Sequence, residues 1–128
     1  MTRERREEVV LIALVVSAAI ESYRKCLREE AKTEALASAA LALGKLEFRA
    51  GEFEKADATL KRAVALNSAD AKARAEAYLT LAKNAEGKGD AKSAVAYATV
   101  VQSLFDDAAA IAEAKKIVAA HPEAKEAE

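Results

Sequence analysis

Residues 37–70, ASAALALGKLEFRAGEFEKADATLKRAVALNSAD, decide the fold of this chain. Gly51 separates two segments that both show helical periodicity. In the second segment Phe53, Ala56 and Leu60 recur at spacings of three and four, which places them on one face of a helix. No Pro- or Ser-rich linker separates the two segments. A glycine in that position therefore indicates a tight turn between two antiparallel helices.

The same pattern occurs a second time, in residues 75–107, AEAYLTLAKNAEGKGDAKSAVAYATVVQSLFDD. The matching positions of this second copy are Tyr78, Leu81, Ala82, Gly89, Ala94, Val101 and Leu104, which correspond to Ala40, Leu43, Gly44, Gly51, Ala56, Ala63 and Leu66. The two turn glycines lie 38 residues apart. The chain therefore repeats a helix–turn–helix unit.

Both copies resemble the tetratricopeptide repeat, which has a period of 34 residues and the pattern Trp-x2-Leu-Gly-x2-Tyr, Ala-x3-Phe and Pro. Leu43 and Gly44 match the Leu-Gly pair, and Ala56 matches the packing alanine. The departures are Ala40, Glu47 and Ser68, which replace the Trp, the Tyr and the Pro, while Phe48 can supply aromatic bulk one position further on. The resemblance implies an all-α fold, a short right-handed α-solenoid of about two and a half helix pairs.

We expect about six helices in a single helical-repeat domain spanning residues 1–128. Its parts are a long N-terminal helix within residues 1–33, a first repeat at 37–70, a second repeat at 71–107 and a C-terminal capping helix at 108–121. The predicted helices cover residues 3–30, 34–50, 53–67, 70–87, 90–105 and 107–120. Thr33, Asp90, and either Asp106 or Asp107 are the expected N-caps.

The N-terminal helix contains an unusual apolar run, VVLIALVVSAAI at residues 9–20. A secretory signal has a similar apolar core, but Glu4, Glu7 and Glu8 interrupt its basic start and no convincing cleavage site follows. A membrane span needs about 20 apolar residues, so the run is too short to cross a bilayer. Association with a membrane surface through residues 9–20 is the weakest of the functional hypotheses.

Two faces of this helix are apolar. One stripe is expected to dock on the repeats and consists of Val9, Ile12, Val16, Ile20, Tyr23 and Leu27. Val10, Leu11, Leu14 and Val15 make the first half of the helix apolar on the other side as well. A helix that is apolar all round must be covered all round. Either the lengthened helix at 70–87 covers these four residues within the chain, or a second copy does, and we expect a homo-oligomer, in the first instance a dimer.

Composition argues against several classes of partner. The net charge is −1 with 32% charged residues, so nothing favours binding to nucleic acid or to an anionic membrane. Cys26 is the only cysteine, which excludes an internal disulfide and makes a reducing, cytoplasmic location the expectation. Because it shares a face with Tyr23 and Leu27, we expect it to be a small buried hydrophobe, with a reactive thiol as the alternative.

No pattern of catalytic or metal-binding residues is found, so we expect neither an enzyme nor a cofactor. His121 precedes Pro122 and is expected at a frayed helix end. Residues 87–89, Gly-Lys-Gly, lack the spacing of a phosphate-binding loop and are interpreted as a turn. Glu52, Glu54 and Asp57 lie among basic residues and are expected on a solvated helix face.

Two functions of different classes remain. The first is a self-associating assembly scaffold, and the regular spacing and alanine richness would also suit a designed helical-repeat protein. The second is an adaptor that binds a peptide or protein, as the resemblance to tetratricopeptide repeats suggests. It would place peptide contacts on the concave face at Leu41, Lys45, Arg49, Leu79 and Lys83. Lys45, Arg49 and Lys83 would favour an acidic peptide.

Overall fold

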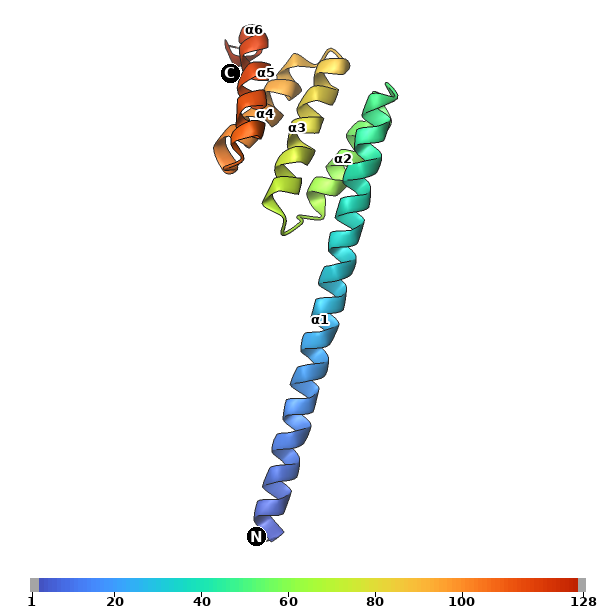
Figure 1. Ribbon diagram of the computed structural model, residues 1–128, viewed down its shortest axis with the longest axis vertical. Helices are drawn as coiled ribbons and strands as arrows, with labels where there is room; N and C mark the ends of the chain where they lie inside the picture. The colour runs from blue at the N-terminus through green and yellow to red at the C-terminus, as the bar shows by residue number, and fades with distance from the viewer. Residues whose placement is uncertain (1–2, 127–128) are drawn as a thin grey trace. The chain divides into compact units, whose positions relative to one another are not determined.

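This computed structural model describes residues 3–126, which form helices joined by short connections (Figure 1). Its helices are α1 (Arg3–Arg49), α2 (Phe53–Ala65), α3 (Ala71–Gly87), α4 (Ala91–Leu104), α5 (Ala108–Ala120) and α6 (Pro122–Glu126). From α2 onward each helix packs against the next one in the chain. The predicted all-α class, with helices paired in succession, is confirmed.

Helix α1 differs from the prediction, because it is one uninterrupted helix of 47 residues instead of two helices separated near Thr33. The Thr33 hydroxyl donates a hydrogen bond to the carbonyl oxygen of Glu29, four residues earlier, at 3.0 Å. That bond belongs to the interior of a helix and not to an N-cap. Residues 28–36 contain neither Gly nor Pro and are mostly strong helix formers, so nothing local ends the helix there.

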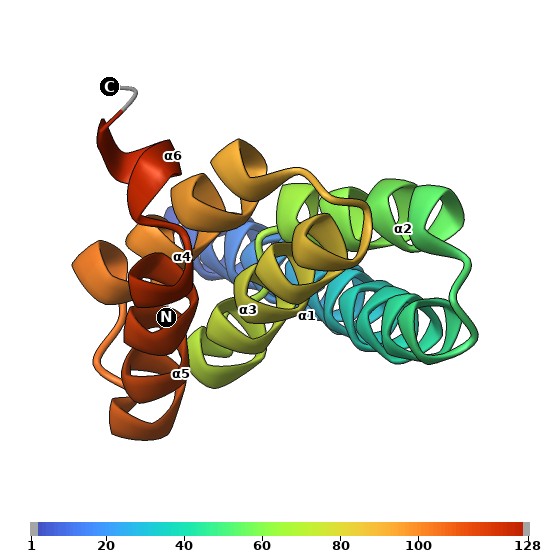
Figure 2. The ribbon, with the colours of Figure 1, turned by 90° about the horizontal axis from the view of Figure 1, so that it is seen from above.

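The chain divides into two compact units, Met1–Thr33 and Glu34–Glu128. The N-terminal unit consists of the first part of α1 and, as a single helix, has no interior of its own. The C-terminal unit contains the remainder of α1 and helices α2–α6. Viewed from above, α2, α3, α4 and α5 follow one another across this unit (Figure 2).

The C-terminal unit has two adjoining hydrophobic clusters. The first joins α1, α2 and α3 through Leu41, Ala56, Leu60, Ala77 and Leu81. The second joins α3, α4 and α5 through Ala75, Leu79, Ala82, Ala85, Ala94, Ala98, Val101, Ala110, Ala114 and Ile117. Alanine predominates in the second cluster, with seven of its ten residues, whereas the first has three leucines and two alanines, so small side chains bring the helices close and a few large ones fill the space between them.

The predicted glycine turns and the caps predicted at Asp90 and Asp107 are confirmed, whereas the cap predicted at Thr33 is not. Gly51 and Gly89 both have φ of 78°, a conformation that glycine adopts without strain. The Asp90 carboxylate accepts a hydrogen bond from the Ser93 N–H at 3.1 Å, and Asp107 caps α5 in the same way. Hydrogen bonding from Ser93 lowers the pKa of Asp90 below its usual value. Lys88 and Gly89 form the turn that was predicted at 87–89, and Gly87 is the last residue of α3.

Candidate interaction surfaces

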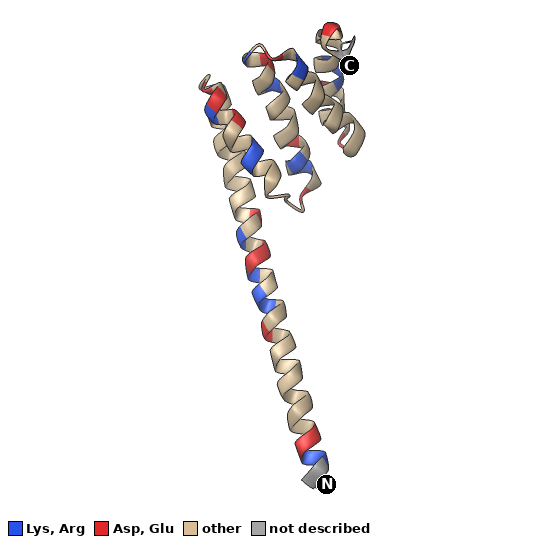
Figure 3. Cartoon of the chain, turned by 180° about the vertical axis from the view of Figure 1, so that it is seen from behind, with Lys and Arg blue, Asp and Glu red and all other residues tan. Residues whose placement is uncertain are grey.

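The N-terminal unit carries a continuous apolar surface that we call the apolar collar, made of Val9, Val10, Leu11, Ile12, Leu14, Val15 and Val16. Every one of these side chains is at least half exposed, from 50% at Val16 to 68% at Val15. Figure 3 shows the collar as an uncharged stretch of α1 between two groups of charged residues. The four residues predicted to form an oligomer interface, Val10, Leu11, Leu14 and Val15, all belong to it.

The remainder of the N-terminal unit also differs from the prediction. The whole stripe that was expected to dock on the repeats is 45–68% exposed, and it consists of Val9, Ile12, Val16, Ile20, Tyr23 and Leu27. Cys26 was expected to be buried and is an exposed free thiol. Both expectations required a neighbouring helix along this side of α1. Because α1 is unbroken, residues 3–30 are not a separate helix that could turn back and pack as the partner of residues 34–49.

The residues predicted to contact a peptide are arranged differently from what the sequence suggested. Leu41 and Leu79 are only 9% and 8% exposed, and they pack in the core, which leaves little of either side chain for a ligand to contact. Lys45 forms an ion pair with Glu76, and Lys83 forms one with Glu113 at 2.7 Å. Both lysines therefore join neighbouring helices of the C-terminal unit. Arg49 is exposed.

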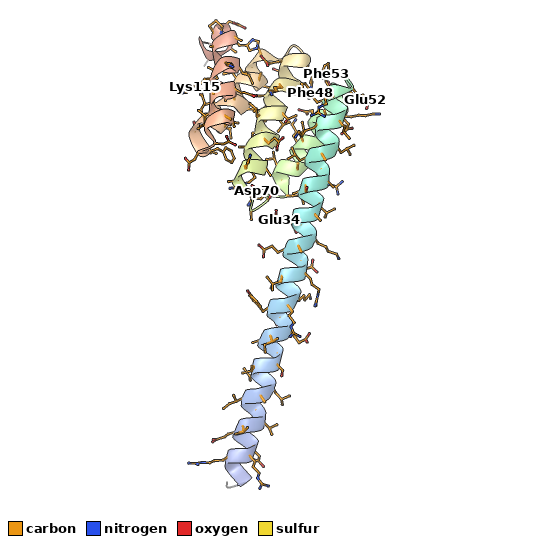
Figure 4. The ribbon with its side chains drawn as sticks, in the orientation of Figure 1. Glu34, Phe48, Glu52, Phe53, Asp70 and Lys115 are labelled. Atoms are coloured by element: carbon orange, nitrogen blue, oxygen red, sulfur yellow. The ribbon has the colours of Figure 1, made fainter. Side chains whose placement is uncertain are left out.

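A polar contact that sequence reasoning missed joins α1 to the connection between α2 and α3. The Glu34 carboxylate accepts hydrogen bonds from the Ser68 hydroxyl at 2.6 Å and from the Ala69 N–H at 2.7 Å. These two bonds lower the pKa of Glu34. Figure 4 labels Glu34 and Asp70 at this connection. Asp70 in turn caps α3, so one short segment fixes the beginning of that helix.

His121 was expected at a frayed helix end. It does lie at the end of α5, but its side chain contacts two carboxylates. Its Nε2 lies 2.8 Å from the Glu86 carboxylate, which connects the end of α5 to α3. Its Nδ1 lies 3.6 Å from Glu123. This arrangement of one histidine and two carboxylates holds helices together, and residues 3–126 contain no group of side chains suited to a metal ion.

A second apolar surface belongs to the C-terminal unit and was not predicted. Leu36, Leu43 and Leu46 lie along one side of α1 and are 51%, 52% and 60% exposed. A groove of about 230 Å³ runs beside them, lined by Leu36, Ala39, Ala40, Leu43, Thr59 and Arg62. We call this side of α1, with Thr59 and Arg62 of α2, the open edge.

Comparisons with protein-family models, with curated proteins and with solved structures found no match. The resemblance to tetratricopeptide repeats therefore rests on the sequence pattern of this chain. In the part of the chain that the structure describes, no helix has the length and apolar character needed to cross a membrane.

Proposed function

We propose that this protein is a non-enzymatic assembly scaffold that associates with itself through the apolar collar of α1. The observation that carries the proposal is the exposure of Val10, Leu11, Leu14 and Val15, between 57% and 68%, on a segment that is apolar on both sides. Contiguous apolar surfaces of this kind are rare on monomeric proteins and mark sites of association. The repeat-like C-terminal unit would then be the part that each copy displays.

The free energy of burying the collar favours its association with another apolar surface, and a second copy of the same segment supplies one. Fully burying one Val or Leu side chain contributes about 1.5–3 kcal/mol, so covering four of them offsets much of the entropy lost on association. A twofold dimer is the smallest closed assembly of identical chains, and it covers one side of each collar. A larger ring would cover both sides. The collar therefore sets a dimer as the minimum assembly.

Light scattering across a concentration series tests this proposal. The wild-type chain should have at least the mass of a dimer at low micromolar concentration. Val10→Glu/Leu14→Glu should be a monomer there, because two carboxylates would have to be buried in the contact. Circular dichroism should show that the variant retains its helices. The matched control is Ser22→Glu/Lys25→Glu, on the polar part of the same helix, which should assemble as the wild type does.

A wild-type monomer throughout the series would contradict the proposal. A variant that keeps the wild-type mass would contradict the assignment to the collar. If the wild type is a monomer, the peptide-adaptor hypothesis becomes the leading one. An acidic-peptide titration of the wild type and of Lys45→Glu/Lys83→Glu would then test it, because that hypothesis requires the double variant to lose binding.

A further inference from the structure

The open edge of the C-terminal unit is exposed, whereas the equivalent residues of the second repeat are buried by neighbouring helices. Three residues of the edge, Ala39, Leu43 and Leu46, occupy the same places in the first repeat as residues 38 positions later in the second repeat. Those equivalents are Ala77, Leu81 and Asn84, and they are 3%, 1% and 0% exposed. They are covered because α1 and α2 precede α3. The part of α1 that belongs to the C-terminal unit has no preceding helix pair within residues 34–126 to cover it in the same way.

The two ends of the C-terminal unit differ in chemistry. The outward side of α5 presents Ala108, Ala112 and Lys115, which are all exposed and include no large apolar side chain. Lys115, labelled in Figure 4, is the charged residue of this side. Stacking the open edge of one copy on the α5 end of another would therefore bury the Lys115 ammonium among leucines. Head-to-tail stacking is disfavoured, and the open edge needs a different partner.

We propose that the open edge associates with the open edge of a second copy, in an antiparallel, twofold-symmetric contact. The apolar positions 36, 39, 43 and 46 are spaced by three, four and three residues, and this spacing reads the same in both directions. In an antiparallel pair, Leu36 lies opposite the partner's Leu46, and Ala39 lies opposite the partner's Leu43. A small residue then faces a large one, which lets the helices approach closely.

Charge at the two ends of the edge fits the same arrangement. Glu47 follows Leu46, is partly exposed and forms no ion pair within residues 3–126. Arg62 lines the groove near the end of α2, is exposed, and forms no ion pair within the described residues. The antiparallel pairing brings Glu47 of each copy toward the partner's Arg62. The edge is thus self-complementary in charge as well as in shape.

The contact is independent of the apolar collar and is expected to be the weaker of the two, since a stable interface buries about 1,200–2,000 Å² in total and the edge is small. The test therefore uses chains that carry Val10→Glu/Leu14→Glu, so that the collar does not contribute. Sedimentation velocity from about 1 μM to 1 mM should show a monomer at the lowest concentrations and a monomer–dimer equilibrium with a Kd of about 100 μM or weaker. A strict monomer up to the highest concentration would overturn the proposal.

Substitutions in the same background locate the contact. Leu43→Glu should weaken the dimer at least tenfold, whereas Ala112→Glu, at the opposite end of the unit, should leave it unchanged. Circular dichroism and thermal unfolding of both variants exclude a loss of folding as the cause. An unchanged dimer in Leu43→Glu would overturn the proposal, as would a dimer that Ala112→Glu dissociates.

Charge reversal tests the twofold geometry directly. Glu47→Arg and Arg62→Glu should each weaken their own homodimer about tenfold, because each places like charges opposite one another in both halves of the contact. An equimolar mixture of the two variants should recover the dimer, since the mixed pair restores opposite charges on both sides. If the mixture stays as dissociated as its components, Glu47 does not face Arg62 and the antiparallel geometry is wrong.

Discussion

Gly44 and Gly87 show how single residues set the helix spacing in the C-terminal unit. A Cβ atom at Gly44 would lie 2.5 Å from Cδ2 of Leu60, a side chain that is fully buried. A Cβ atom at Gly87 would lie 2.6 Å from the ring of Phe53. Glycine is unfavourable inside a helix by roughly 1 kcal/mol relative to alanine. Close packing, and not backbone conformation, therefore explains the glycine at position 44.

The change in the free energy of unfolding caused by Gly44→Ala has one sign if packing dominates and the opposite sign if helix propensity dominates. Because Leu60 has no room to move outward, we expect the free energy of unfolding to fall by about 1–3 kcal/mol, the usual effect of overpacking. Propensity alone would raise it. Urea unfolding of the wild type and the variant measures the difference, and an increase in the midpoint would show that α1 and α2 are not in close contact at this position.

Glu34 provides a pH-dependent prediction at the residue scale. Its pKa is lowered in the folded chain, so the hydrogen bonds from Ser68 and Ala69 stabilise the fold above the usual pKa of 4.5 and are lost as the pH falls below it. Glu34→Gln should therefore be less stable than the wild type at pH 7. The gap should narrow in thermal melts recorded at successively lower pH. Glu30→Gln, on an exposed part of α1, is the control, and a gap independent of pH would contradict the role given to the carboxylate.

At the scale of elements, most helix boundaries could be predicted from the sequence because their signals are local. Gly51, Gly89, Asp90 and Asp107 end or begin helices through their own backbone conformation or side chain, so α2 to α5 lie within about two residues of the predicted ranges. The predicted break near Thr33 followed from the repeat pattern and had no such signal. There α1 continues, and the buried environment expected for Cys26 is absent.

Thr33 and Asp90 form a matched pair for testing helix boundaries. Asp90→Ala should lower the free energy of unfolding by about 0.5–2 kcal/mol, because it removes a cap. Thr33→Ala should have little effect or raise helix content slightly, because alanine is the better residue inside a helix. Chemical denaturation with far-ultraviolet circular dichroism measures both. A loss at Thr33 as large as the loss at Asp90 would indicate that a helix begins there.

At the scale of the whole molecule, the sequence predicted one exposed apolar surface and missed another. The collar was predictable because residues 9–16 are apolar on every side of a helix, whatever they pack against. The leucines assigned to a peptide site, Leu41 and Leu79, point into the core, and periodicity cannot separate a concave face from a packed one. Leu36, Leu43 and Leu46 were missed because their equivalents one repeat later are core positions or polar.

The self-association of α1 is tested most directly through Cys26, the single cysteine and an exposed one. It lies 12 residues after Leu14, so paired collars bring the two thiols within about 40 Å in either helix orientation. Copies labelled separately with donor and acceptor should show energy transfer when mixed. Leu43→Glu should keep the transfer, and adding Val10→Glu/Leu14→Glu to Leu43→Glu should abolish it. Absence of transfer in the wild type, or its persistence in the triple variant, would contradict association through the collar.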